Sequence, residues 1–351
     1  MTRKPTIKDV ARLAGVGPMT VSRLLNQSAH VSDEAAARVY SAVEKLGYRP
    51  NEMARALRGH KSRTIGIIVP YLYDPFFAMC AHAINTVARE NGYSVILTTS
   101  NEDANTEYAE AQLMMRRHVD GLIVIPANGG RSRLSLSEFH ATHIVALDRP
   151  LQDRRFSSVV VENRVGVERA IDHLISRHGH QRIAFAALND HLYTFHTRLE
   201  GYNRAMQQAG LMPLPMLRCP TQEAAAAVLL GALRGPQAPT AIFTANGLTT
   251  RYALKALLDA GIRIPADLAL VAFDDFDMAE SLQPRLSVVR QPAQELGWVA
   301  ANLLFERLTS KELPEQGTRV VLPVEWVPRN SCGCGDSASV QLSQESCGKT
   351  V

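Results

Sequence analysis

Residues 6–26 have the sequence TIKDVARLAGVGPMTVSRLLN, and the pattern predicts two short helices joined by a tight turn. Thr6 and Asp9 have the spacing of an N-terminal capping box, which begins a helix. Gly15 ends this helix, because glycine readily adopts the left-handed conformation of a C-terminal cap. Pro18 suits the first position of a second helix, where its missing N–H costs nothing. The segment therefore predicts a helix-turn-helix, a motif whose second helix enters the major groove of DNA.

Apolar side chains recur at helical spacing in both helices and in a third helix expected from about Ser32 to Leu46. In the first two helices the apolar positions are Val10, Leu13, Ala14, Val21, Leu24 and Leu25. In the third helix they are Ala36, Val39, Tyr40, Val43 and Leu46. Ser32 is the expected N-cap of the third helix, and Gly47 ends it. These stripes predict one small core shared by three helices.

The basic residues of the chain concentrate near its N-terminus. Residues 1–63 contain twelve Lys and Arg against five Asp and Glu, a net charge of +7, whereas the whole chain carries +4. Residues 64–351 therefore carry −3. This distribution is expected of a domain that contacts DNA phosphates joined to one that does not. The alternative, a purely structural helical hairpin, does not account for the charge.

Several motifs resemble, in order and spacing, those of the lactose repressor family of bacterial transcription regulators (LacI/GalR type). In the N-terminal region they are TIKDVARLAGV (6–16), TVSRLLN (20–26), LGYRPN (46–51) and ARALR (54–58). Further along they are IGIIVP (65–70), DPFF (74–77), VDGLIV (119–124), DRP (148–150), HLISRHGHQRIA (173–184), RLEGY (198–202), AGIRIPADLALVAFDD (260–275) and PRLSVVRQP (284–292). The resemblance covers about residues 5–330. It implies a DNA-binding regulator, most often a repressor, whose operator affinity is controlled allosterically by a small molecule.

Residues 50–59, PNEMARALRG, are good helix formers between a proline and a glycine, in a run too short to be stable alone. The resemblance implies that this segment is a hinge helix that folds on DNA, pairs with its dimer mate and inserts a leucine into the minor groove. Leu57 is the matching residue. Such an apolar wedge kinks the duplex and couples DNA shape to the hinge. The alternative is a plain linker with an incidental leucine.

A homodimer on a palindromic operator is expected, because one helix-turn-helix buries little groove surface. The family's tetrameric member has a C-terminal leucine heptad helix, and residues 337–351 are polar and lack heptads. The residues expected to contact DNA are Thr6, Gly17, Pro18, Met19, Thr20, Ser22, Arg23, Asn26, His30, Asn51, Ala54, Leu57 and Arg58.

From Arg63 onward, short runs of Val, Ile and Leu alternate with helical stretches. Strands are predicted at 64–69, 94–98, 121–125, 144–147, 158–161, 183–187, 241–244, 268–273, 287–290 and 320–326. Such runs are typical of parallel strands covered on both faces, and their number predicts an α/β core of two doubly wound lobes. The resemblance implies a core like that of periplasmic binding proteins.

Four parts of the chain are expected. Residues 1–49 are the DNA-binding headpiece, 50–62 the hinge and linker, 63–336 the effector-binding and dimerisation core, and 337–351 a disordered tail. The chain is expected to cross between the two lobes near residues 162 and 290.

Aromatic and polar residues follow the predicted strands, at the sheet edge where ligands of doubly wound folds bind. Aromatic faces beside such donors and acceptors suit a polyhydroxylated ligand with apolar C–H faces. The expected effector-binding residues are Tyr73, Asp74, Phe76, Phe77, Asp148, Arg149, Asn163, Arg198, Asn246, Asp274 and Gln291. The resemblance implies effector contacts for Arg198, Asn246 and Asp274 in particular. Each of these residues has a structural alternative, since Asp and Asn at loop ends often cap helices.

Three positions of the core depart from the family pattern. Gly247 replaces the usual Asp after Asn246, Glu162 the usual Asp before Asn163, and Ala272 the usual Gly. The missing acid, with Arg149, Arg198 and Arg131 present, predicts a pocket that tolerates an anionic sugar acid. The alternative is that Gly247 only makes room for a larger neutral sugar.

Other classes of protein are disfavoured. The sequence contains no dinucleotide or phosphate loop, nucleophile elbow or HExxH motif, so neither an enzyme nor a cofactor is expected. An exported sugar-binding protein is opposed by an N-terminus without an apolar signal segment, which predicts a cytoplasmic location. A regulator that answers to a protein corepressor stays open.

The five cysteines are scattered, as expected of reduced thiols. Cys332-Gly-Cys334 could be half of a metal site, but no further ligand with suitable spacing stands nearby in the sequence, so no metal is expected.

Overall fold

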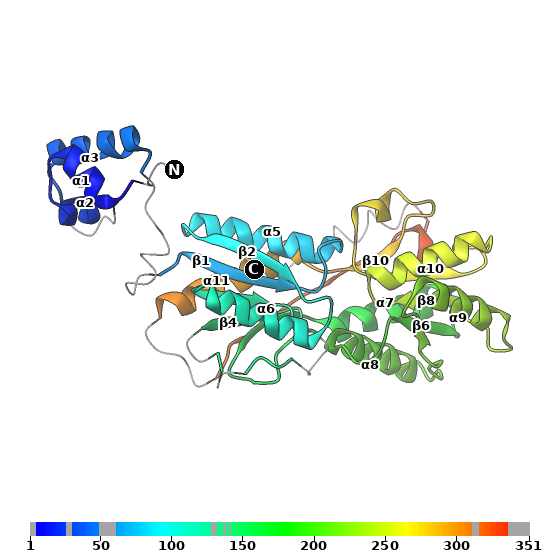
Figure 1. Ribbon diagram of the computed structural model, residues 1–351. Helices are drawn as coiled ribbons and strands as arrows, with labels where there is room; N and C mark the ends of the chain where they lie inside the picture. The colour runs from blue at the N-terminus through cyan, green and yellow to red at the C-terminus, as the bar shows by residue number, and fades with distance from the viewer. Residues whose placement is uncertain are drawn as a thin grey trace, which may run out of the picture. The chain divides into compact units, whose positions relative to one another are not determined.

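The computed structural model of the chain describes residues 5–25, 30–48, 61–127, 132–135, 138–139, 142–310 and 316–335 (Figure 1). Its contacts divide the chain into two units, Met1–Ser62 and Arg63–Val351. The predicted hinge helix at 50–59 and the predicted tail at 337–351 lie outside the described residues.

The described residues of the first unit form the helices α1 (Ile7–Ala14), α2 (Pro18–Leu25) and α3 (Asp33–Leu46). The predicted capping box is confirmed, because the backbone N–H of Thr6 donates to the Asp9 carboxylate at 2.9 Å. Gly15 has a φ of 65°, which confirms it as the left-handed residue that ends α1. Gly47 ends α3 in the same conformation.

The core of the first unit is built largely on small side chains. Its fully buried members are Val10, Ala11, Ala14, Val21, Val39 and Ala42. The predicted stripe is wrong at Leu13 and Tyr40, whose side chains are 52% and 55% exposed. Ala11 and Ala42 lie in the interface instead, since small side chains let the three short helices approach closely.

The first lobe of the second unit is a six-stranded parallel sheet in the order β11-β5-β4-β3-β1-β2. Its strands are β1 (Thr64–Val69), β2 (Ser94–Thr99), β3 (Gly121–Val124), β4 (His143–Leu147), β5 (Ser157–Val161) and β11 (Arg319–Leu322). Helices α5 (Pro75–Glu90) and α11 (Ala293–Thr309) cover one face, and α6 (Ala104–Arg116) covers the other (Figure 1).

The second lobe repeats this plan in the order β12-β10-β9-β8-β6-β7. Its strands are β6 (Ile183–Ala187), β7 (Leu217–Arg218), β8 (Ala241–Thr244), β9 (Ala269–Phe273), β10 (Ser287–Arg290) and β12 (Glu325–Val327), of which only β12 is antiparallel to its neighbour. Helices α7 (Asn163–His178) and α8 (Tyr193–Gln208) cover one face, and α9 (Gln222–Arg234) and α10 (Gly247–Asp259) the other. Two short 3₁₀ helices, η2 (Asp277–Glu280) and η3 (Asn330–Cys332), complete it.

The two-lobed, doubly wound core is confirmed, but its last strand was predicted wrongly. The stretch 320–326 forms two strands, β11 and β12, which belong to different sheets. Pro323 separates them, since it cannot donate to a sheet ladder. The two-residue strand β7 was not predicted at all.

The chain passes between the lobes at three places. It leaves the first lobe after β5, returns to it after β10, and crosses once more between β11 and β12. The sequence had predicted passages near 162 and 290, without the third. No helix among the described residues is long and apolar enough to span a membrane.

Candidate functional site

The surface of the helix-turn-helix carries the first set of predicted site residues. Gly17, Pro18, Met19, Arg23 and His30 are exposed, and Thr6, Thr20 and Ser22 are partly exposed. The Met19 side chain at the start of α2 is 68% exposed. These side chains are therefore accessible to a partner such as DNA. The other predicted contacts, Asn26, Asn51, Ala54, Leu57 and Arg58, lie outside the described residues.

A cavity of about 530 Å³ lies between the two lobes, beyond the carboxyl ends of strands from both sheets. Ten of the eleven predicted effector-binding residues line it: Tyr73, Asp74, Phe76, Phe77, Asp148, Arg149, Arg198, Asn246, Asp274 and Gln291. Their convergence makes this cavity the candidate effector site, although contact with a ligand stays a prediction.

Asn163, the eleventh residue, does not line the cavity and instead positions Arg198. Its Oδ1 accepts a hydrogen bond of 2.7 Å from Arg198 Nε. Arg198 Nη1 donates to the carbonyl of Ala245 at 2.6 Å, and the guanidinium lies 3.5 Å from the centre of the Phe273 ring. No hydrogen bond within the described part of the chain involves Arg198 Nη2, which leaves this donor for a ligand.

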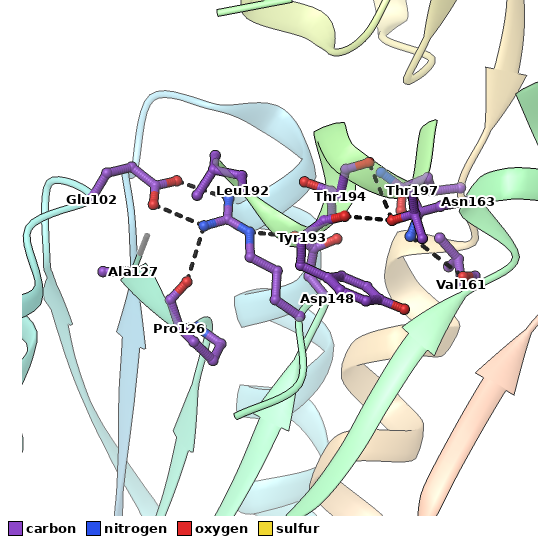
Figure 2. A network of polar contacts seen from close by, with 12 residues as sticks. Glu102, Pro126, Ala127, Asp148, Val161, Asn163, Leu192, Tyr193, Thr194 and Thr197 are labelled. Carbon is purple, nitrogen blue, oxygen red and sulfur yellow. Dashed lines mark hydrogen bonds and ion pairs between the residues drawn. The ribbon is translucent and has the colours of Figure 1, made fainter. Parts of the chain in front are cut away.

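Arg149 is fully engaged by its neighbours. Its Nη1 and Nη2 each donate to the Glu102 carboxylate at 2.8 Å, and its Nε pairs with Asp148 at 3.2 Å. Nη1 also donates to the carbonyl of Pro126 at 3.0 Å. Figure 2 shows Glu102 and Pro126 directed toward this guanidinium and Asp148 beside it. The positive charge of Arg149 is therefore neutralised within the protein.

Asp148 and Asp274 follow β4 and β9 with backbone φ angles of 64° and 80°, a conformation that side-chain-bearing residues rarely adopt. Asp274 accepts hydrogen bonds from Gln291 Nε2 at 2.5 Å and from the backbone N–H of Gly247 at 3.1 Å. Within the described residues, the Oε1 of Gln291 is buried without a partner. A buried acceptor at the edge of a cavity is a natural contact for a ligand hydroxyl.

Burial shifts the ionisation of several groups in the cavity. It raises the pKa of Asp74 to about 6, and the nearby charge of Asp274 adds to this shift. Burial also raises the pKa of Asp148, against the opposing effect of Arg149 and Arg198. Burial lowers the pKa of Arg198. Burial alone would lower the pKa of Arg149 too, but Glu102 and Asp148 more than reverse the effect.

Two of the lining residues also cap helices. Asp74 accepts a hydrogen bond from the backbone N–H of Phe76 at 3.0 Å, at the start of α5. Asn246 accepts from the backbone N–H of Thr249 at 3.0 Å, at the start of α10. The structural alternative considered for such residues thus applies to these two, without excluding a ligand contact by their remaining atoms.

Sequence reasoning missed part of the lining. The cavity is also bounded by Glu102, His191, Leu192, Thr194, Phe195, Pro220, Leu248 and Tyr252. Glu102 follows β2, so the rule that found Asp148 after β4 would have found it as well. The residues from α8 and α10 gave no such signal, because they depend on how these helices pack.

A second cavity, of about 670 Å³, lies near η2 and the start of α11. Its one arginine is already paired, since Arg290 contacts Asp275 at 2.8 Å and Glu325 at 3.1 Å. The cavity between the lobes is the better candidate, because it holds the available Nη2 donor of Arg198 at the strand ends where ligands of doubly wound folds bind.

The sequence shows no further metal ligand with suitable spacing beside Cys332 and Cys334, but the structure brings two histidines close to them. His173 and His178 of α7 bring ring nitrogens to the two thiols, and the four donor atoms lie within 4.8 Å of one another. The sequence did not reveal this, because about 150 residues separate the two pairs along the chain.

Comparison with known proteins gives consistent matches for both units. Residues 6–51 match the family described as bacterial regulatory proteins, lacI family, and residues 171–332 match the periplasmic binding protein-like domain. The ribose operon repressor of Escherichia coli (strain K12) is 31% identical over 89% of this chain and 95% of its own length. The HTH-type transcriptional repressor PurR of Aliivibrio fischeri (strain MJ11) is 29% identical over 88% of this chain and 93% of its own length.

Two solved structures of transcription regulators match the fold of this chain over most of its length. The lac repressor dimer bound to operator and the anti-inducer ONPF has a TM-score of 0.82 and 25% identity, over 94% of this chain and 99% of that one. The complex of the transcriptional regulator CelR with cellobiose has a TM-score of 0.68 and 29% identity, over 93% of this chain and 99% of that one.

Proposed function

The chain belongs to the lacI family of bacterial regulatory proteins, and on that basis we propose that it represses a carbohydrate-utilisation operon in response to a small, neutral, polyhydroxylated effector. It is a DNA-binding transcriptional repressor with a ligand-binding core, as its relatives are, and not an enzyme.

The cavity between the lobes carries the proposal for the effector. The stacked rings of Tyr71 and Tyr73, with centroids 5.0 Å apart, offer an apolar surface to the C–H faces of a sugar. Arg198 Nη2 supplies a donor and Gln291 Oε1 an acceptor for hydroxyl groups. A sugar ring bound between these groups would pack its C–H faces against the tyrosine rings and form hydrogen bonds through the hydroxyl groups at its edge.

The charge balance of the cavity supports a neutral effector over a sugar acid. Four carboxylates, those of Asp74, Glu102, Asp148 and Asp274, line it together with Arg149 and Arg198. Arg149 forms ion pairs with Glu102 and Asp148, so its charge is neutralised and does not attract an anionic ligand. A ligand carboxylate or phosphate would meet repulsion from Asp74 and Asp274. These facts favour the interpretation that Gly247 gives space to a neutral sugar.

The proposal for DNA is a homodimer on a palindromic operator. The matching structure of the lac repressor is a dimer bound to operator, and two half-sites related by a two-fold axis supply the affinity that one helix-turn-helix lacks. We assign base contacts to the exposed start of α2, at Gly17, Pro18 and Met19, and the minor-groove wedge to Leu57. Bacterial operators lie in the cytoplasm, where the protein is therefore assigned.

The test of the effector class combines calorimetry with an operator gel shift on the full chain. We expect neutral pentoses, hexoses or disaccharides to bind and to change the mobility shift, and their matched aldonic acids to bind more weakly. Gln291→Met should weaken binding of the neutral sugar by about 10-fold, because a hydroxyl loses its buried acceptor. Exposed Gln294 provides the control, Gln294→Met, which should leave binding unchanged.

Tight binding of the acids alone would contradict the neutral effector while leaving repression intact. Operator binding that responds to none of the sugars would point to the remaining alternative, a protein corepressor.

A further inference from the structure

Two histidines and two cysteines from distant parts of the chain meet in the second lobe. His173 Nε2 lies 3.3 Å from Cys334 Sγ and 3.7 Å from Cys332 Sγ. His178 Nε2 lies 3.4 Å from Cys334 Sγ. All four donor atoms lie within 4.8 Å of one another, in the part of the chain that the structure describes. The cluster lies outside the effector cavity, whose lining contains none of these residues.

From this geometry we propose that His173, His178, Cys332 and Cys334 bind one Zn²⁺ ion. Tetrahedral zinc has bonds of about 2.3 Å to sulfur and about 2.0–2.1 Å to nitrogen, which place sulfur and nitrogen ligands about 3.5 Å apart. The three sulfur–nitrogen distances of 3.3, 3.4 and 3.7 Å are close to this separation. The donor atoms thus already stand near the corners of a zinc tetrahedron.

The chemistry of the four ligands selects the metal. Two thiolates and two imidazoles suit zinc and other borderline or soft ions, whereas Mg²⁺ and Ca²⁺ prefer oxygen ligands. Four protein ligands leave no open position for water or substrate, so the site is structural and does not conflict with a protein that has no catalytic activity.

The local structure builds the site from two rigid pieces. His173 and His178 lie in the last turns of α7, which Gly179 ends with a φ of 69°. Cys332 and Cys334 flank Gly333, whose φ of 104° is a conformation that favours glycine. A Cβ at Gly333 would lie 3.1 Å from His178 Nδ1, so glycine also leaves room for the ring.

The cysteine segment is anchored independently of any metal. Ser331 Oγ donates to the carbonyl of Leu270 at 2.6 Å and accepts from the backbone N–H of Ser287 at 2.8 Å. Arg329 pairs with Asp275 at 2.8 Å. These contacts hold both thiols against the end of α7 before an ion arrives, which reduces the entropy cost of binding.

Both histidines direct a ring nitrogen, Nε2, toward the thiol of Cys334. The His173 ring also packs against Trp326, with ring centroids 5.2 Å apart, which makes this tryptophan an optical probe of the site.

Zinc bound here would fasten the C-terminal segment to α7. Asn163, which positions Arg198, begins the same helix, about 15 Å from His173 at 1.5 Å per residue. We expect the ion to stabilise the second lobe without changing effector affinity, so the site is independent of the proposed effector.

The test is a titration of the reduced, chelator-stripped full chain with Zn²⁺ alone, in competition with a chromophoric chelator. One equivalent should bind, raise the thermal unfolding temperature and change the fluorescence of Trp326. Co²⁺ in place of zinc should give the visible bands of tetrahedral cobalt and a thiolate charge-transfer band. A chain that binds neither ion overturns the proposal.

Ligand variants decide which residues bind. Cys334→Ser and His178→Gln should each weaken zinc by more than about 100-fold, since even loss of an outer-shell partner costs 10- to 100-fold. Cys219→Ser, a buried cysteine elsewhere in the lobe, and His196→Gln, an exposed histidine of α8, are the controls and should leave affinity unchanged.

If each variant without metal unfolds at the same temperature as the metal-free wild type, the variants fold correctly. Zinc should then raise the unfolding temperature of the wild type and of the control variants only. Unchanged affinity in both ligand variants would reject the four-ligand site. Cys347 lies outside the described residues, and a loss of binding in Cys347→Ser would equally overturn the assignment.

Discussion

Asp148 and Asp274 occupy equivalent places in the two lobes. Each follows the third strand of its sheet, β4 or β9, and has a positive φ. The backbone N–H of Asp148 donates to Val159 on the next strand, and that of Asp274 to Val289, at 2.8 and 3.0 Å. Left-handed backbone at such residues costs about 1–3 kcal/mol each. Its occurrence at the same place in both lobes favours a functional reason, namely that both carboxylates reach the cavity.

Asp274→Asn should weaken effector binding by about 10- to 100-fold, because a charged acceptor is worth about 1.5–3 kcal/mol in a hydrogen bond. Asparagine tolerates the left-handed backbone and can still accept from Gly247, but it loses the hydrogen bond from Gln291 Nε2, so the thermal unfolding temperature should fall slightly. Calorimetry and thermal unfolding measure the two effects. Asp277→Asn, on the exposed start of η2, is the control. Equal sugar affinity in both variants would remove Asp274 from the site.

Asp74 should make the stability of the core depend on pH. Its folded pKa of about 6 exceeds the ordinary value of 3.8, so the native state binds the proton more tightly than the unfolded chain does. The free energy of unfolding contributed by Asp74 therefore falls as pH rises from about 4 to about 6, and stays low above that.

Asp74→Asn keeps the cap of α5 and removes this titration. The unfolding temperature of the variant minus that of the wild type should increase from about pH 4 to about pH 7, as measured by calorimetry. Asp259→Asn, an exposed aspartate of α10 paired with Lys255, should show no such trend. A difference that is flat across this range argues against the raised pKa.

Residue types at strand ends were enough to predict about half of the cavity lining, because the fold fixes where such residues converge. Asn163 shows the limit of that reasoning. The sequence places it after β5 like the others, but its side chain turns toward Arg198 and not toward the cavity. The rotamer that decides between the two roles is not encoded in strand spacing.

Helices α7 and α8 pack closely against each other and carry Asn163 and Arg198. A Cβ added to Gly201 of α8 would lie 2.5 Å from the carbonyl oxygen of Arg164 on α7. Arg198 lies one turn before Gly201 and binds Asn163, one residue before Arg164. The closeness of the two helices is thus what allows this hydrogen bond.

Gly201→Ala should separate α7 from α8 and reduce both stability and effector affinity, with a cost of about 1–3 kcal/mol in the free energy of unfolding. Denaturant unfolding and calorimetry measure the two effects. Gly231→Ala in α9 is the matched control, because nothing lies within 4 Å of its added Cβ and alanine favours a helix by up to about 1 kcal/mol. A Gly201→Ala chain as stable as the control would show that the helices adjust freely.

Elements with strong periodic patterns were predictable, and those defined by tertiary partners were not. The capping box at Thr6 and Asp9 located α1 to the residue. By contrast, two-residue β7 exists only because it pairs with β6, and 320–326 contains two strands because they join different sheets. Single-strand periodicity carries no information about which sheet a strand joins.

At the scale of the whole molecule, control of DNA binding depends on coupling between effector and operator. A ligand that binds two arrangements of the lobes unequally shifts their populations, and the hinge segment would carry that shift to the headpieces. Leu57 lies outside the described residues, so its part in this coupling stays a prediction from the sequence.

Leu57→Ala should weaken specific operator binding and leave effector affinity unchanged, since the wedge acts only on DNA. Arg23→Ala, on exposed α2, should instead weaken binding to all DNA and lower the salt slope by about one unit if it contacts a phosphate. Fluorescence anisotropy at several salt concentrations separates the two behaviours. Parallel loss of operator and effector binding in Leu57→Ala would indicate misfolding, not a lost wedge.

The final crossing of the chain, from β11 to β12, affects how the protein can be made. These two strands cover β5 and β10, which otherwise form the open edges of the two sheets. Ribosomes synthesise the chain from its N-terminus, so both edges stay unpaired until residues 319–327 leave the exit tunnel. Exposed strand edges promote aggregation, so a message truncated before codon 319 should yield insoluble chains with two unfinished lobes. The headpiece needs none of these residues and can fold while translation is still under way.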